Sequence, residues 1–161
     1  VSTERLCRVI GEHLAEQERG PASLLAACAD EDVPVFVPGI TDGSVGAQLW
    51  SWYETHRKFQ VDLLADEHRL SQLVDEGERL GAIMVGGGIS KHHLIWWAQF
   101  REGLDDAVYI TTAPEHDGSL SGARMREAIS WSKMKPEAGH VTVPGEATVL
   151  LPLILGAALA E

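Results

Sequence analysis

From about Val33 onward, short runs rich in β-branched and apolar residues alternate with stretches whose apolar positions have helical spacing. The runs that predict strands are residues 33–37, 60–63, 82–85, 107–111 and 140–143. The stretches that predict helices are residues 47–56, 66–80, 90–101, 124–131 and 147–159, with one more helix before Gly20. Strands and helices that alternate in this way form βαβ units, whose strands run parallel. The pattern therefore predicts an α/β fold with helices on both faces of a mostly parallel sheet.

The charge of the chain restricts its partners. Lys and Arg number 13 while Asp and Glu number 24, which gives a formal net charge of −11. This charge repels phosphate backbones, so we expect no nucleic-acid partner, and it makes a cationic, polyamine-like ligand plausible. A well-solvated acidic surface with no role in binding is the alternative interpretation.

Two cysteines and one apolar run bear on the cellular location of the protein. Cys7 and Cys28 lack the paired spacing of metal ligands, and a chain of 161 residues needs no disulfide to build a core. We therefore expect reduced thiols, no metal site and a cytoplasmic protein. The longest apolar run, residues 149–160, is too short to span a bilayer, so we expect no membrane segment. Because the first residue is Val rather than Met, we expect a cut or truncated part of a longer product.

The tripeptide Asp-Gly-Ser occurs twice, each time after a predicted strand and before a predicted helix. The first copy begins at Asp42, and the second contains Gly118 and Ser119. Loops at the carboxyl ends of parallel strands are where ligands bind in such sheets. Either copy alone could be an ordinary turn and helix cap, but two copies at one edge favour a binding site.

A run of three glycines, residues 86–88, follows a predicted strand and leads into Ser90-Lys91-His92-His93. Glycines at this place would let a nucleotide approach the backbone, although Lys91 stands where the complete dinucleotide fingerprint has a third glycine. A tight structural turn is an equal alternative. One of the two imidazoles could act as a base or orient a cationic substrate, and a surface or packed histidine is the other interpretation.

Glu127 and Trp131 stand four residues apart on a predicted helix, so a carboxylate and an indole share one face. Such a pair suits an ammonium group, because the carboxylate supplies charge and the indole supplies cation–π attraction. Lys133 follows at the helix end, where an amine kept neutral beside an indole could form an imine. From spacing alone, a solvated lysine is the alternative.

Three segments together resemble one enzyme family. They are PVFVPGITDGSVG from Pro34, GGGISKHH from Gly86 and AVYITTAPEHDGSLSGARMREAISWSKMKP from Ala107. In order and spacing they resemble deoxyhypusine synthase of the archaeal type, from about Val33 to the C-terminus, and they match only the C-terminal half of such an enzyme. The resemblance implies a Rossmann-like NAD domain that assembles as a tetramer. It also implies NAD-dependent transfer of the aminobutyl group of spermidine, through an enzyme lysine imine, to a lysine of the hypusine-bearing translation initiation factor.

Carried over residue by residue, the resemblance makes Lys133 the imine-forming nucleophile and His92 the residue at the reacting amine. The positions that match amine-binding residues are Gly118, Ser119, Glu127 and Trp131. The positions that match NAD-contacting residues are Asp42, Gly87, Thr112, Ala113, Glu146 and Ala147, with Glu146 where the eukaryotic form has Asp.

The chain also departs from the family pattern near the predicted site. Leu120 and Ala47 stand where the eukaryotic pattern has aspartates that contact the polyamine, and Ser132 replaces a glycine beside the lysine. We predict that residues 1–161 are the C-terminal half of an NAD-dependent transferase, active only when joined by an N-terminal half that this chain lacks. Two alternatives stay open. One is a homospermidine synthase-like enzyme that joins small amines, and the other is a catalytically silent NAD-binding or assembly subunit.

Overall fold

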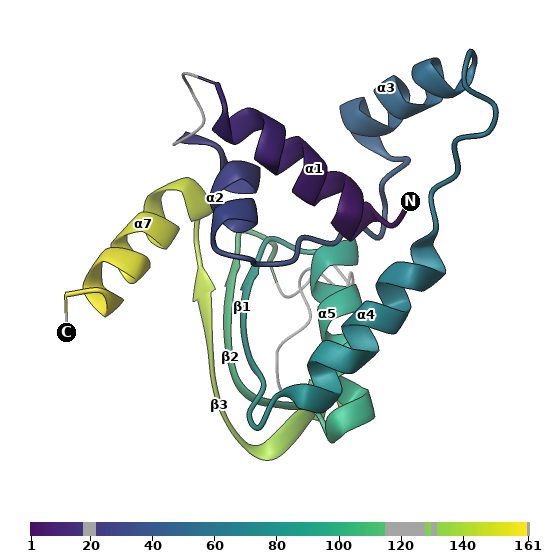
Figure 1. Cartoon of the computed structure of the whole chain (residues 1–161). Helices are drawn as coiled ribbons and strands as arrows, with labels where there is room; N and C mark the ends of the chain where they lie inside the picture. The colour runs from purple at the N-terminus through teal and green to yellow at the C-terminus, as the bar shows by residue number, and fades with distance from the viewer. Residues whose placement is uncertain (18–21, 115–127, 130–131, 161) are drawn as a thin grey trace. The chain divides into compact units, whose positions relative to one another are not determined.

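The computed structural model of the chain describes residues 1–17, 22–114, 128–129 and 132–160 (Figure 1). The chain forms two compact units, Val1–Leu70 and Ser71–Glu161, and the division between them falls within a helix. The first unit is helical in its described part, and the second contains the sheet.

The helices that begin in the first unit are α1 (Thr3–Ala15), α2 (Leu24–Asp30), α3 (Gly43–Tyr53) and α4 (Leu63–Glu76). α1 confirms the helix predicted before Gly20. It packs closely on α2, and glycine at position 11 allows this approach, since a Cβ there would overlap the backbone of Leu25. Asp66 on α4 fixes the start of α1, since its carboxylate accepts the N–H groups of Thr3 (2.8 Å) and Glu4 (3.0 Å). A carboxylate at this end also complements the helix dipole.

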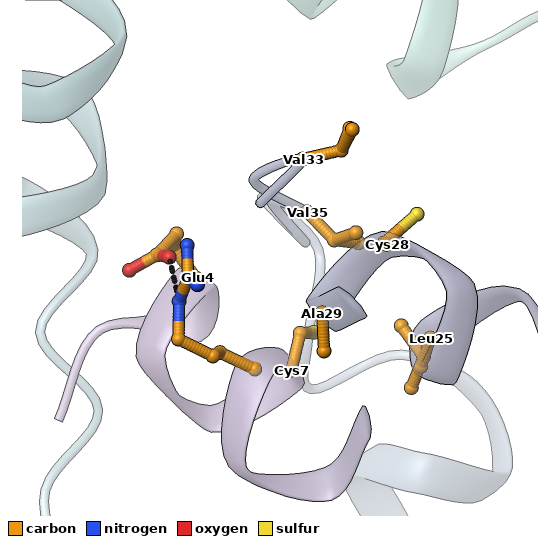
Figure 2. Close-up of a pocket in the computed structure, with 8 residues that line it drawn as sticks. Glu4, Cys7, Leu25, Cys28, Ala29, Val33 and Val35 are labelled. Atoms are coloured by element: carbon orange, nitrogen blue, oxygen red, sulfur yellow. Dashed lines mark hydrogen bonds and ion pairs between the residues drawn. The ribbon is translucent and has the colours of Figure 1, made fainter. Parts of the chain in front are cut away.

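A small pocket of about 10 Å³ lies beside α1 and α2 and has room for no more than one water (Figure 2). Both cysteines line it, Cys7 from α1 and Cys28 from α2, and both are free thiols in the structure. Burial raises the pKa of the Cys7 thiol, and the nearby carboxylates of Asp66 and Glu4 raise it further. Cys7 is therefore a poor nucleophile at neutral pH.

The second unit contains a three-stranded parallel sheet, which confirms the predicted α/β class. The strands are β1 (Gly81–Val85), β2 (Leu104–Thr111) and β3 (Met134–Pro144), and they lie side by side in chain order. β1 and β2 are connected by α5 (Ile89–Ala98) and a 3₁₀ turn (Gln99–Arg101), and β3 is followed by α7 (Ala147–Ala158). Parallel strands require a crossover of this kind, because both must start from the same edge.

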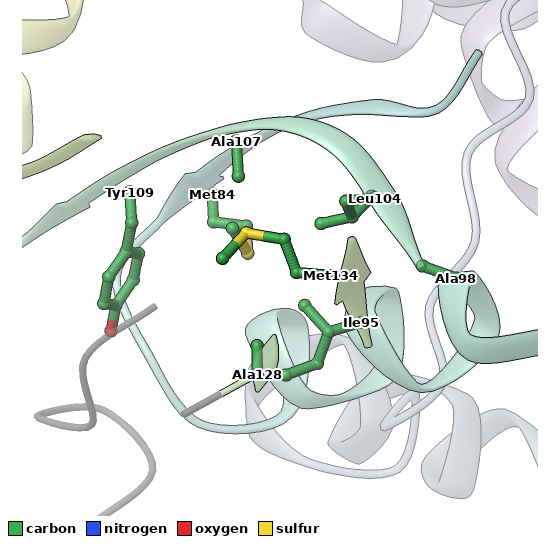
Figure 3. Close-up of a cluster of buried hydrophobic side chains, with 8 residues drawn as sticks. All are labelled: Met84, Ile95, Ala98, Leu104, Ala107, Tyr109, Ala128 and Met134. Atoms are coloured by element: carbon green, nitrogen blue, oxygen red, sulfur yellow. The ribbon is translucent and has the colours of Figure 1, made fainter. Parts of the chain in front are cut away.

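One face of this sheet forms the core of the second unit (Figure 3). Met84 and Tyr109 are register neighbours on β1 and β2, and they are 3% and 1% exposed. Ile95, from α5, packs among them and is 2% exposed. The buried cluster consists of Met84, Ile95, Ala98, Leu104, Ala107, Tyr109, Ala128 and Met134. This packing holds α5 and the start of β3 against the same layer of side chains.

The opposite face of the sheet is only partly covered. Two rows of register neighbours cross it: Ile83, Val108 and Val141, and Val85, Ile110 and Val143. Ile110 on the central strand is 0% exposed, but Ile83 and Val141 on the outer strands are 53% and 50% exposed. Parallel sheets are normally covered on both faces. The outer strands therefore present β-branched side chains that further protein could cover.

α7 is apolar on every side and leaves the end of β3 (Figure 1). It contains no charged residue, none of its residues is buried, and Leu153 is 66% exposed. A helix that is hydrophobic all round is normally enclosed by protein or by lipid. Among the described residues, no helix is long and apolar enough to cross a membrane. Separately, an exposed apolar surface such as that of α7 is of the kind that marks a contact with protein or lipid.

Two predicted strands are wrong. Residues 33–37 form no strand, because the N–H of Val33 donates to the Cys28 carbonyl (2.8 Å) and that of Val37 to Thr3 Oγ1 (2.9 Å). The strand predicted at residues 60–63 is also absent: residues 60–62 form no regular element and α4 begins at Leu63, where Asp62 Oδ1 accepts the N–H of Ala65 (3.0 Å). The remaining predicted strands are present, and β3 is longer than predicted. The helix predicted at residues 124–131 is described only at 128–129.

Candidate active site

The carboxyl edge of the sheet brings three turns together. β1 leads into residues 86–88, β2 into residues 112–113 and β3 into residues 145–146. The N–H of Gly86 donates to the Ile110 carbonyl (2.9 Å), and the N–H of Gly145 donates to the Thr111 carbonyl (2.9 Å). The last two residues of β2 therefore bind both neighbouring turns, the one that follows β1 and the one that follows β3.

The glycine turn after β1 depends on glycine for its conformation. Gly86 and Gly88 have φ angles of +78° and +70°, which side chains disfavour. Among the described residues, a Cβ built at either glycine meets no atom within 4 Å, so that part of the structure leaves open space beside the turn. Gly88 is also the N-cap of α5, and it offers no side chain to the first N–H groups of that helix. Such a turn suits an anionic group that approaches the backbone closely.

The structure gathers five of the six predicted NAD-contacting residues at this edge. Gly87 lies in the glycine turn, Thr112 and Ala113 directly follow β2, and Glu146 and Ala147 begin α7. They come from three separate turns, and the register of the parallel strands aligns those turns. This arrangement is that of a ligand edge in an open parallel sheet.

Two of the predicted NAD positions have particular surroundings. Glu146 is the N-cap of α7, and its Oε2 accepts the N–H of Thr148 (3.0 Å) and also the Thr148 hydroxyl. Its carboxylate therefore has a helix-capping role. Asp42 is the N-cap of α3 in the first unit, where its side chain makes no capping hydrogen bond. Asp42 belongs to the first unit, whereas the other five residues belong to the second.

Lys133 lies at the opposite end of the sheet, one residue before β3 begins. It is 6% exposed, which excludes the solvated lysine that spacing alone left open. Its N–H donates to the Ala128 carbonyl (2.9 Å), and its carbonyl accepts the N–H of Leu104 (3.1 Å). The preceding residue, Ser132, has a φ angle of +55°. Glycine adopts this conformation more easily than serine, which gives a physical reason for the glycine of the family pattern at this position.

Lys135, two residues after Lys133, has a structural partner. Its Nζ lies 2.6 Å from Asp105 Oδ1, and the same carboxylate accepts the N–H of Leu80 (2.8 Å). The hydrogen bond from Lys135 lowers the pKa of Asp105, and the bond from Leu80 lowers it further. These contacts join β2 to β3 and to the residue before β1. Lys135 therefore has a structural role at this end of the sheet.

Trp96 on α5 connects the two predicted catalytic residues. Lys133 Nζ lies 5.3 Å from the centroid of the Trp96 ring, and that ring stacks on His92 with 5.8 Å between the ring centroids. His92 and Lys133 are 41 positions apart in the sequence, yet both reach the same indole. Trp96 was not among the predicted site residues. Its spacing of four from His92 on a helix is the signal that could have identified it.

Lys91 is a second buried lysine, which the sequence pattern did not single out. It is 3% exposed, and its Nζ lies 4.0 Å from the centroid of the Tyr109 ring. An ammonium at this distance from an aromatic face makes a cation–π contact. Lys91 thus links the first turn of α5 to the buried face of the sheet.

The predicted amine-binding residues lie outside the described residues. These are Gly118, Ser119, Glu127 and Trp131, and the departure at Leu120 lies there too. Within the described ranges, no three His, Cys, Asp or Glu side chains are grouped so that they could hold a metal ion.

Comparison with known proteins agrees with the resemblance and extends it. The family model described as deoxyhypusine synthase matches residues 1–158, so the similarity begins well before Val33. A probable deoxyhypusine synthase from Thermoplasma volcanium is 61% identical over 134 residues, which cover 83% of this chain and 43% of the relative. One from Ignicoccus hospitalis is 52% identical over 156 residues, covering 94% and 48%. One from Pyrobaculum calidifontis is 50% identical over an alignment of 163 residues, covering 98% and 54%.

The chain therefore spans about half the length of the curated relatives it matches. The family model covers the described sheet, the glycine turn, Trp96 and Lys133. Both comparisons lead to the same assignment, and the chain belongs to the deoxyhypusine synthase family.

Proposed function

We propose that this chain carries the imine-forming lysine of an NAD-dependent enzyme that transfers the aminobutyl group of spermidine to a protein lysine. The observation that carries the proposal is the burial of Lys133 with its Nζ over the indole that stacks on His92. A buried amine beside an aromatic ring meets the chemical requirements of an imine nucleophile, because water is excluded and the nitrogen is held in place. Membership of the deoxyhypusine synthase family supports the same activity.

NAD fits the carboxyl edge of the sheet. The open space beside Gly86 and Gly88 leaves room for a phosphate to approach the backbone, and the turns after β2 and β3 lie alongside. Gly87, Thr112, Ala113, Glu146 and Ala147 would hold the cofactor there, with Asp42 as a further contact. When bound, NAD supplies a hydride acceptor for the carbon next to the secondary amine and later a hydride donor.

The residues of this chain account for the transfer itself. The Lys133 nitrogen adds to the imine carbon of the oxidised donor, and the bond from that carbon to the leaving diamine breaks. The aminobutyl group is then held on Lys133 as an imine until the acceptor lysine adds to the same carbon and releases Lys133. His92 would orient the reacting amine and accept or return its proton. Glu127 and Trp131, with Gly118 and Ser119, would bind the cationic end of the donor.

The partners we propose are the N-terminal half of the same enzyme and, in the assembled form, further copies that make a tetramer. The exposed apolar surface of α7 and the partly covered outer strands support a need for more protein on the second unit. The acceptor is the hypusine-bearing translation initiation factor. We place the reaction in the cytoplasm, where the free thiols of Cys7 and Cys28 would stay reduced.

A homospermidine synthase-like transfer between small amines is the second candidate. It keeps the chemistry and changes the acceptor. Leu120 and Ala47 stand where the eukaryotic pattern has two carboxylates that contact the polyamine, so the outer amine is held differently or the donor differs from spermidine. A catalytically silent assembly subunit is the third. The experiment that separates these candidates incubates the chain, coexpressed with the N-terminal half of a relative, with NAD and labelled spermidine. Acceptor protein is present in one arm and absent in the other.

Label that transfers to the acceptor protein supports the proposed function. Label found only in a larger polyamine supports the second candidate, and no turnover in either arm supports the third. Borohydride should trap the labelled group on Lys133, and Lys133→Arg should abolish both trapping and turnover. Lys135→Arg is the matched control, since it keeps the charge that pairs with Asp105, and it should retain both. Trapping at another lysine would refute the assignment of Lys133.

A further inference from the structure

Trp96 contacts the proposed nucleophile yet has no role in the reaction described above. Trp96 is 45% exposed, whereas Lys133, which contacts its ring, is 6% exposed. Lys133 Nζ lies 5.3 Å from the ring centroid, within the roughly 6 Å over which an aromatic face attracts a cation. The stacked His92 ring, inclined by 28°, limits how the indole can rotate. The indole is therefore a fixed aromatic group beside the reacting nitrogen.

The imine on Lys133 is most reactive toward an incoming amine when it is protonated, and it is then a cation. A carboxylate beside this cation could take its proton. An indole face attracts positive charge through its quadrupole but is neither a base nor a competing nucleophile. An indole can therefore stabilise the iminium ion and leave its carbon electrophilic.

We propose that Trp96 stabilises the cationic iminium on Lys133, and that this residue governs how much of the covalent intermediate accumulates. The proposal rests on the proposed function, in which Lys133 forms that imine. It assigns Trp96 an electrostatic role that the amine-binding residues Glu127 and Trp131 do not fill, because those residues are expected to hold the distant cationic end of the donor.

The test uses butanal as a probe, because it carries no ammonium group and so does not need the amine-binding residues. The Lys133 nitrogen forms a bond to the aldehyde carbon. The aldehyde oxygen leaves as water with one proton from the amine and one from the solvent. Cyanoborohydride then reduces the iminium, and peptide mass spectrometry measures butylation of Lys133. In parallel, acetic anhydride converts the same amine to a neutral amide, which reports access to Lys133 without creating a cation.

The ratio of butylation to acetylation at Lys133 is the readout. We expect Trp96→Leu to lower this ratio by about 2- to 30-fold, the range that one cation–π contact supports. Trp96→Phe, which keeps an aromatic face, should retain most of it. Trp97→Leu is the matched control on the same helix, since Trp97 packs against Phe100 instead, and it should leave the ratio unchanged.

Two outcomes would overturn the inference. The ratio could stay unchanged in Trp96→Leu, and a fall in acetylation as large as the fall in butylation would then indicate a packing role only. Alternatively, the ratio could fall equally in Trp97→Leu. Failure of the proposed function has a different signature. In that case wild-type Lys133 would form no more iminium, relative to its acetylation, than the exposed Lys58, and both proposals would be wrong.

Discussion

Gly103 offers a sharp test of how the structure positions Lys133. Its φ angle is +97°, and a Cβ at this position would lie 2.6 Å from the Met134 nitrogen and 2.8 Å from the Lys133 carbonyl carbon. Gly103→Ala therefore carries two costs. The left-handed backbone costs about 1–2 kcal/mol for a residue with a side chain, and forcing a methyl group into filled space costs about 1–3 kcal/mol more. We expect a total loss of about 2–5 kcal/mol in the free energy of unfolding.

Gly86→Ala is the matched control, because Gly86 also has a positive φ, +78°, but a Cβ there meets no atom of the part of the chain that the structure describes within 4 Å. The Gly86→Ala variant should lose only the part of the unfolding free energy that comes from the left-handed backbone, about 1–2 kcal/mol. Urea unfolding of the two variants measures the difference. Acetylation of Lys133, relative to Lys58, should change in Gly103→Ala and not in Gly86→Ala, because only the first displaces the Lys133 backbone. Equal destabilisation of both variants, with equal acetylation of Lys133, would refute this description of the turn.

Three further predictions concern the packing and titration of the described residues. Asp105 has a lowered pKa in the folded state, so its contribution to stability is present above its ordinary pKa of about 3.9 and is lost as the pH falls below that value. Asp105→Asn should flatten that part of the curve of unfolding free energy against pH. Iodoacetamide at neutral pH should label the half-buried Cys28 before Cys7, whose thiol is buried and has a raised pKa, and mass spectrometry over time would reveal the opposite order if it occurred. Ile95→Ala should cost about 2–5 kcal/mol in urea unfolding, while Ile83→Ala at its half-exposed position should cost far less, and similar losses would contradict the assignment of the two sheet faces.

The sequence predicted best those parts of the fold whose signals are local. The run into the glycine turn predicted β1 nearly to the residue, and the run at residues 107–111 predicted the carboxyl end of β2. The two wrong strands failed for a physical reason. An extended run such as residues 33–37 becomes a strand only if a neighbour accepts its hydrogen bonds, and here a helix end and a threonine hydroxyl take the donors instead. Propensity alone does not specify that neighbour.

The candidate site was predictable only in part. The resemblance alone named Gly87, Thr112 and Ala113 as residues of one site, and the structure places them at one edge of the sheet, because parallel strands end together. The burial of Lys133 and its approach to Trp96 depend on contacts between α5 and the start of β3, and no local pattern in the sequence specifies such a contact. The roles assigned to Gly118, Ser119, Glu127 and Trp131 stay predictions.

The hydrogen bonds at the carboxyl end of β2 also have a consequence for motion. The amide protons of Gly86 and Gly145 are both held by carbonyls of consecutive residues in one strand. Opening the end of that strand would release both protons, so their exchange with deuterated solvent should follow a shared local opening. A ligand that touched only the glycine turn would then slow exchange at Gly145 as well, across the full width of β2, because it would remove the fluctuation that exposes both.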